Sequence, residues 1–156
     1  MKVKSIFDRY KTQIQGDAVF DAIRQKYVHL TPEEIVRQKT VKFLMKRLGV
    51  PRNRIIVERS LSSLGIEGSR RRIDIGIFDD AARLMAVVEC KASLSRGDEA
   101  AFIQAQNYFQ ELHARYFFVT DGCTFSGYYF DTLQFIRLEE IPRYEEWRHY
   151  PTAREP

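Results

Sequence analysis

Two strand-like segments joined by a short polar turn constrain the fold of this chain more than any other feature of its sequence. In RRIDIGIFDD, residues 71–80, apolar and other residues alternate as in a β-strand, with Ile73, Ile75 and Ile77 on one face and Asp74, Gly76 and Phe78 on the other. The turn DDAAR leads directly into the apolar segment LMAVVECKA, residues 84–92. Because so short a connection joins neighbouring strands, we expect an antiparallel hairpin.

The segments around this hairpin predict the remaining elements. TPEEIVRQKTVKFLMKRLGVP, residues 31–51, is typical of a helix, with Thr31 as N-cap, Pro32 in the first turn and Gly49 after the end. RIIVERSL (54–61) and RYFFVTDG (115–122) predict strands, and residues 98–113 have helical spacing. A strand, a helix and a strand of these lengths form a crossover, so the strand at 115–122 is expected to lie parallel to the second hairpin strand.

This order predicts an α/β fold with a central mixed sheet of four main strands flanked by helices, in the order αβββαβ. The chain of 156 residues, 44% of them hydrophobic, suits one domain with its own core. We expect the core at about residues 31–122 and peripheral additions at both ends: an N-terminal arm at 1–30, and a C-terminal hairpin and tail at 123–156.

Composition narrows the environment and the partners. The sequence has neither an apolar stretch of membrane-spanning length nor the apolar region of a signal peptide, so we expect a cytoplasmic protein without membrane contact. Cys90 and Cys123 lie in apolar runs and are expected to be reduced core thiols rather than a disulfide or zinc ligands. The net charge of +4 leans only slightly toward a polyanionic partner. The densest basic cluster, Arg70, Arg71 and Arg72, either holds phosphates or solubilises a loop.

The second hairpin strand ends in two opposite charges, Glu89 and Lys91. Residues two apart in a strand share a face, so these side chains project to the same side and Cys90 to the other. If the register brings Asp74 level with Glu89, two carboxylates meet, and their repulsion favours a cation between them. Mg²⁺, held by one or two carboxylates and water, suits such a pair, with Lys91 orienting or deprotonating a water. The alternative is an exposed Glu89–Lys91 ion pair at a strand end.

Asp74, the short hairpin and the ECK sequence at 89–91 resemble the PD-(D/E)XK nuclease superfamily. Within it, the chain is similar to the N-terminal nuclease domain of type I restriction enzyme R subunits, in the form that also occurs as small stand-alone proteins. The similarity runs from about residue 18 to residue 142. It includes VFDAIRQKYVHLTPEEIVRQ, RRIDIGIFD, VVECKA, a Gln-x-x-x-Tyr element at 104–108, and YFFVTDG.

The resemblance implies a restriction-endonuclease-like core and a centre that uses Mg²⁺, for which Mn²⁺ can substitute. The implied metal ligands are Asp74, Glu89 and the backbone carbonyl of Cys90. The other implied catalytic residues are Lys91, as the catalytic lysine, Gln104 of the Gln-x-x-x-Tyr element, and Glu34, which would approach the metal directly or through water. The implied partner is DNA. The residues expected to contact it are Arg70, Arg71, Arg72, Tyr108 and Gln38. A separate motor or specificity subunit and a dimer are compatible with this interpretation.

Several alternatives stay open at this point. Glu34 at the third helical position can instead complete a capping box with Thr31. Gln104 can face solvent on a helix that buries Tyr108. Ile73 stands where the family has a proline, and Thr-Asp-Gly at 120–122 stands where relatives often have Thr-Asn-Gly.

The sequence contains no Gly-rich phosphate loop, so we expect no ATP-driven motor in it. The rival function is a non-catalytic module that binds nucleic acid or docks a partner. RNA or a structured junction is an equally open substrate.

Overall fold

The computed structural model describes residues 7–91, 103, 107, 111–131 and 134–149. Short 3₁₀-helices lie at Arg52–Arg54, Ser62–Leu64 and Tyr144–Glu146. The elements whose bounds are described are, in chain order, β1 Ile14–Gln15, β2 Ala18–Asp21, β3 Lys26–His29, α1 Pro32–Lys46, β4 Ile55–Ser60, β5 Arg72–Phe78, β6 Leu84–Cys90, β7 Tyr116–Thr120, β8 Phe125–Phe130 and β9 Phe135–Arg137.

Helix α1 forms where its start and stop signals predicted it. Thr31 has extended backbone angles, and its hydroxyl oxygen accepts the backbone N–H of Glu34 at 3.1 Å, which satisfies one of the free donors of the first turn. Pro32 occupies the first turn, where a missing N–H costs nothing. The helix ends before Gly49, whose φ of +75° suits a residue without a side chain.

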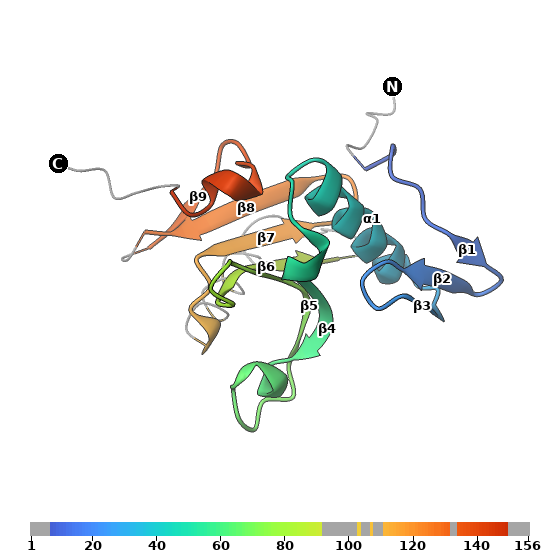
Figure 1. Ribbon diagram of the computed structural model, residues 1–156, viewed down its shortest axis with the longest axis horizontal. Coiled ribbons are helices and arrows are strands. Elements are labelled where there is room, and N and C mark those ends of the chain that lie inside the picture. Colours follow the sequence, from blue (N-terminus) through green and yellow to red (C-terminus); the bar gives the residue numbers. More distant parts are fainter. Residues whose placement is uncertain (1–6, 92–102, 104–106, 108–110, 132–133, 150–156) are drawn as a thin grey trace.

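The main sheet has six strands in the order β4-β5-β6-β7-β8-β9. Strands β5 and β6 form the predicted antiparallel hairpin, and β6 pairs with β7 in parallel, as expected for a crossover. Figure 1 shows α1 lying across one face of this sheet. The chain is therefore α/β with a mixed sheet, as the order of segments predicted.

The prediction of four main strands was wrong, because the hairpin expected at the periphery joins the sheet. Strand β8 pairs with β7 at five consecutive positions, from Tyr116–Tyr129 to Thr120–Phe125, and β9 pairs in turn with β8. Without β8, β7 would present an open row of backbone donors and acceptors. The pairing with β8 satisfies this edge, so the two strands extend the sheet.

The segment expected to be an N-terminal arm forms a second, antiparallel sheet in the order β1-β2-β3. Strand β2 packs against α1 and contributes the buried residues Val19 and Asp21. The turn after β2 is fixed by Asp21, whose Oδ1 accepts the backbone N–H groups of Ile23 at 2.8 Å and Arg24 at 2.9 Å. This turn directs Arg24 toward the start of α1.

The core has one layer on each face of the main sheet. The larger layer lies between the sheet and α1, and the smaller layer, which includes Val87 and Phe117, covers the opposite face. Phe7 and Trp147 are both fully buried in the larger layer, so the packed interior draws on residues before and after 31–122. Tyr116 donates its hydroxyl hydrogen to the carbonyl of Trp147 at 3.0 Å, which ties the C-terminal segment to β7.

The predicted alternation of β5 is broken at Asp74. Ile75 lies in the larger layer as expected, but Ile73 packs in the smaller layer on the other face, so the prediction that Ile73 shares a face with Ile75 was wrong. The partner strand is irregular at the same level. Glu58, between the pairs Val57–Ile75 and Arg59–Ile73, has a φ of +52°, which turns the backbone of β4 out of its regular pleat.

The two cysteines differ in exposure. Cys90 is buried and Cys123 is exposed, and both are free thiols, so the expectation of a core position was wrong for Cys123. Cys123 lies in the turn after β7, where its backbone N–H donates to Asp121 Oδ1 at 2.8 Å.

Most of the helix expected at 98–113, including Gln104 and Tyr108, lies outside the described residues. Within the described part of the chain, no helix is both long enough and apolar enough to cross a membrane.

Candidate active site

The end of β6 holds the first pair of candidate residues. Lys91 Nζ lies 2.9 Å from Glu89 Oε1, so the two side chains share a face as predicted, while Cys90 is buried among the core residues on the other face. Only 8% of Glu89 is exposed, which makes this more than a surface ion pair. The backbone N–H of Lys91 donates to the carbonyl of Thr120 at 2.9 Å, which fixes the chain just beyond the strand.

Asp74 reaches the same place from the neighbouring strand. Ile75 pairs with Val88 in the β5–β6 ladder, and Asp74 and Glu89 are the next residues beyond this pair on their strands. The Asp74 carboxylate accepts the backbone N–H of Cys90 at its Oδ2, 2.8 Å away. The structure therefore brings Asp74, Glu89 and Lys91 together at one end of the hairpin.

A buried arginine that the sequence analysis did not identify faces these carboxylates. Arg37, on α1 and only 4% exposed, donates from Nη2 to Asp74 Oδ1 at 3.0 Å and to Glu58 Oε1 at 2.6 Å. Its Nη1 forms an ion pair with Glu34. Burial works against the guanidinium charge, but the carboxylates of Glu34, Asp74 and Glu58 raise the pKa of Arg37 above its ordinary value. Arg37 is therefore a permanent cation between three elements.

Glu34 belongs to this cluster rather than to a complete capping box. Its backbone N–H donates to Thr31, but its carboxylate is directed elsewhere: Oε2 to Arg37, and Oε1 to Gln38 Nε2 at 3.0 Å and to Arg24 Nη2 at 3.5 Å. The Glu34 carboxylate thus points toward Arg37, the residue that also contacts Asp74. Its expected approach to a metal stays a prediction.

Gln38 does not lie where a DNA contact requires it. It is 1% exposed, and its amide is used at both ends, since Oε1 accepts the backbone N–H of Ala22 at 3.1 Å while Nε2 donates to Glu34. A side chain with so little surface cannot reach a phosphate. The structure therefore corrects the expectation for Gln38 to that of a residue that orients Glu34.

The charges around Lys91 favour its protonated form. Burial alone would lower the pKa of Lys91, but the hydrogen bond and charge of Glu89, followed by the charges of Asp74 and Glu33, raise the pKa above its ordinary value. Lys91 thus acts as a positive charge rather than as a base in this arrangement. Burial, reinforced by the charge of Asp74, raises the pKa of Cys90, so its side chain stays a thiol.

The three arginines ahead of Asp74 are exposed. Arg72 lies 3.5 Å from Glu58 Oε2, and Arg71 lies 3.2 Å from Glu111. Arg72 thus connects the acidic cluster with the surface. Arg70, Arg71 and Arg72 have the exposure that phosphate contact requires, and that role stays a prediction, as do the roles of Gln104 and Tyr108.

Comparison with known proteins adds an independent observation to this geometry. A family described as the type I restriction enzyme R protein N terminus matches residues 32–142. The chain belongs to this family. The match covers more than half of the 156 residues and includes Glu34, Arg37, Glu58, Asp74, Glu89 and Lys91. No curated protein matches the chain.

The donor atoms of this R-protein N terminus suit a divalent metal at Asp74 and Glu89. Among the described residues, no group of three or more His, Cys, Asp or Glu side chains is arranged to hold a metal ion. Asp74 and Glu89 offer two carboxylates, and Mg²⁺ typically takes one or two, with water and phosphate oxygens as its other ligands. Each Asp74 oxygen accepts one hydrogen bond from a described residue, and a carboxylate oxygen can take a second partner. The donor set therefore fits Mg²⁺ or Mn²⁺.

Repulsion between the two carboxylates does not by itself call for a metal, however. Repulsion between Asp74 and Glu89 was expected to require a metal between them. The protein supplies two cations of its own, since Arg37 contacts Asp74 and Lys91 contacts Glu89. The donor atoms, and not unrelieved repulsion, are therefore what fits a metal at this place.

Arg37 and Glu58 are the two residues of the site that sequence reasoning missed. Arg37 is three residues after Glu34, a spacing that places both on one helix face, and this was the available signal. Glu58 carried no comparable signal, because its contribution depends on a backbone angle that a strand pattern does not predict.

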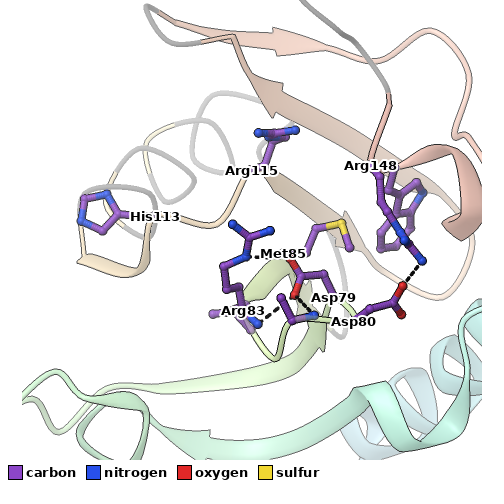
Figure 2. Close-up of a pocket in the computed structure, with 10 residues that line it drawn as sticks. Asp79, Asp80, Arg83, Met85, His113, Arg115 and Arg148 are labelled. Atoms are coloured by element: carbon purple, nitrogen blue, oxygen red, sulfur yellow. Dashed lines mark hydrogen bonds and ion pairs between the residues drawn. The ribbon is translucent and has the colours of Figure 1, made fainter.

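The opposite end of the hairpin carries a pocket of about 390 Å³ (Figure 2). Two ion pairs lie in its lining: Arg83 Nε lies 3.0 Å from Asp79 Oδ2, and Arg148 pairs with Asp80. These ion pairs stabilise the turn between β5 and β6 in the R-protein N terminus. The pocket lies apart from the carboxylates, which are at the other end of β6.

Proposed function

We propose that this domain is a metal-dependent nuclease of the PD-(D/E)XK type, with a restriction-endonuclease-like core, that hydrolyses phosphodiester bonds in DNA. The observation that carries the proposal is the convergence of Asp74, Glu89 and Lys91 at one end of the β5–β6 hairpin. This convergence lies within the segment that matches the R-protein N terminus.

Each residue of the centre has a role in this proposal. Asp74 and Glu89 hold Mg²⁺ or Mn²⁺, with the carbonyl of Cys90 as a further ligand. A bound divalent ion lowers the pKa of its water and neutralises charge on the scissile phosphate. Lys91, kept protonated by its acidic neighbours, stabilises the negative charge that develops on the phosphate oxygens and orients the attacking water.

DNA binding rests on the exposed arginines beside the site. Arg70, Arg71 and Arg72 precede Asp74 directly, so phosphates held by them lie next to the carboxylates. Contacts of this kind read the backbone rather than the base sequence. Sequence choice and translocation would come from a separate specificity or motor subunit, and self-association as a dimer is compatible with the proposal.

Plasmid cleavage tests the proposal. The wild-type protein should nick or linearise plasmid DNA with Mg²⁺ or Mn²⁺ and should be inactive with EDTA. Asp74→Asn and Glu89→Gln should remove cleavage, because each replaces a charged metal ligand with a neutral amide of the same shape. Lys91→Met should lower the rate by roughly 10²–10³-fold, the usual effect of removing one transition-state donor.

A matched control separates the site from general charge effects. Lys26→Met removes an exposed lysine of β3, at a distance from Lys91 along the chain, and should leave the rate unchanged. Equal activity in the wild type and the three site variants would exclude this mechanism.

One observation favours a second candidate, a non-catalytic module that binds nucleic acid or a partner subunit. Both Asp74 and Glu89 are already neutralised by protein cations, so the fold needs no metal for charge balance. Calorimetric titration with Mn²⁺ distinguishes the two candidates. A nuclease centre should bind the ion and lose it in Asp74→Asn, whereas a binding module should show DNA affinity without that metal dependence.

A further inference from the structure

Arg37 occupies an unusual position for a buried arginine. Its two terminal nitrogens contact three carboxylates, Glu34, Glu58 and Asp74, which come from α1, β4 and β5. Burying this many charges is costly unless each is paired, and here one guanidinium pairs them all. The cluster thus has the charge pattern of a cation site whose cation belongs to the protein.

The backbone is distorted to complete this cluster. Glu58 has a φ of +52°, in the left-handed region, where a residue with a side chain is strained. This angle interrupts the regular pleat of β4 and accompanies the contact of Glu58 with Arg37. A strained backbone of this kind persists only where surrounding interactions hold it.

Only the two terminal nitrogens of Arg37 form hydrogen bonds with described residues. Its Nε is buried and has no hydrogen-bond partner among the described residues. A buried donor without a partner costs free energy. The contacts of Nη1 and Nη2 with the carboxylates therefore hold the side chain in a position where Nε stays without a partner.

Asp74 is the link between this cluster and the proposed metal pair. Its Oδ1 faces Arg37, while its Oδ2 faces the backbone of β6 between Glu89 and Lys91. In two-metal nucleases and phosphatases, two cations about 4 Å apart clamp the reacting phosphate. Here one oxygen of the shared carboxylate is already committed to a cation that cannot leave the chain.

We infer that Arg37 takes the place of a second metal ion, so that the centre binds one divalent ion per chain. The inference rests on the proposed function, whose single ion would lie at Asp74 and Glu89. Arg37 is then a positioning residue, because it fixes Asp74 through a direct contact and neutralises the acidic side chains behind it.

The test is the number of Mn²⁺ ions bound per chain, measured with Mn²⁺ alone by calorimetry and by electron paramagnetic resonance of the free ion. Wild-type protein should bind one. Arg37→Gln removes the one cation that Glu34, Glu58 and Asp74 share and should bind one more ion than the wild type. Arg37→Lys keeps a positive charge at the position and should bind the same number as the wild type. Arg83→Gln, which removes an exposed arginine paired with Asp79, is the matched control and should add no ion.

The outcomes separate this inference from the proposed function. No Mn²⁺ in the wild type, or a wild-type ion that survives in Asp74→Asn, overturns the proposed function. The inference itself is overturned by two ions in the wild type, by an unchanged number in Arg37→Gln, or by a gain equal to that in Arg83→Gln. If Arg37→Gln does not fold, the number of Mn²⁺ ions bound by the wild type and by Arg37→Lys provides the test. A second ion in either protein would show that Arg37 does not take the place of a metal ion.

Discussion

Arg37 Nη2 and Asp74 Oδ1 lie 3.0 Å apart, which joins helix α1 to strand β5 at the point where the β5–β6 hairpin ends. This contact connects the catalytic carboxylate of the proposed centre to a cation that is buried with it. The position of Asp74 thus depends on a residue 37 positions earlier in the chain.

Replacement of Arg37 should destabilise the fold strongly. Arg37→Met removes the charge but keeps much of the volume, and it deprives three largely shielded carboxylates of the buried cation that they share. Breaking a buried ion pair in this way costs about 3–5 kcal/mol. Urea unfolding should show this as a lower midpoint with an unchanged slope.

Arg72→Met is the matched control for that measurement. Arg72 contacts the same cluster through Glu58, but its side chain is 62% exposed and the contact is 3.5 Å long. An exposed pair contributes at most about 1 kcal/mol, so its loss should be small. Equal losses in the two variants would show that burial of Arg37 does not determine its contribution.

The positive φ of Glu58 should reverse the usual order of stability of glycine and alanine in a strand. In a regular strand glycine is less stable than alanine, but at a φ of +52° the alanine side chain is strained and glycine is not. Glu58→Gly should therefore be more stable than Glu58→Ala by about 1 kcal/mol, although both lose the same carboxylate. At the neighbouring exposed position, Arg59→Gly should be less stable than Arg59→Ala. The same order at both positions would contradict the strained angle.

Much of this architecture was predictable because it depends on local signals. Thr31, Pro32 and Gly49 predict α1, and the short turn after Phe78 predicts the antiparallel hairpin that brings Asp74 to Glu89. These elements depend on residues close together in the sequence. Local patterns also predicted the hairpin in the C-terminal segment 123–156.

What could not be predicted depends on pairing at long range. The pattern of β8 indicates a strand but not its partner, so its place beside β7 in the main sheet was missed. Arg37 was missed for a similar reason, since its contacts with Glu58 and Asp74 arise only when α1 packs on the sheet. The φ of Glu58 is a property of two paired strands, and a single-strand pattern carries no information about it.

The two thiols should differ in reactivity. Cys123 is exposed, whereas Cys90 is buried and its pKa is raised by burial and by the charge of Asp74. Native protein should release about one equivalent of thionitrobenzoate from Ellman's reagent at mildly alkaline pH, and denatured protein should release two. Cys123→Ser should abolish the fast reaction of the native protein. Two fast thiols in the native wild type would contradict the buried position of Cys90.

Asp21 should make stability depend on pH in the acid range. Its carboxylate is fully buried, and although burial alone would raise its pKa, hydrogen bonds from the backbone and side chain of Arg24 and from Ile23 hold its pKa below the ordinary value of 3.8. A carboxylate whose pKa is lowered by folding stabilises the protein at pH values above its pKa in the unfolded chain. This stability is lost as the pH falls through its pKa in the folded protein. Asp21→Asn should therefore be less stable than the wild type at pH 7 by about 1.5–3 kcal/mol.

The difference between Asp21→Asn and the wild type should shrink as the pH falls below about 3.8, because the wild-type carboxylate then becomes protonated. Asp17→Asn, which replaces an exposed acid in the turn before β2, should follow the wild type at every pH. Urea midpoints measured from pH 7 to pH 2.5 give both comparisons. A difference that stays constant over this range would show that Asp21 stabilises the turn through its shape and not through its charge.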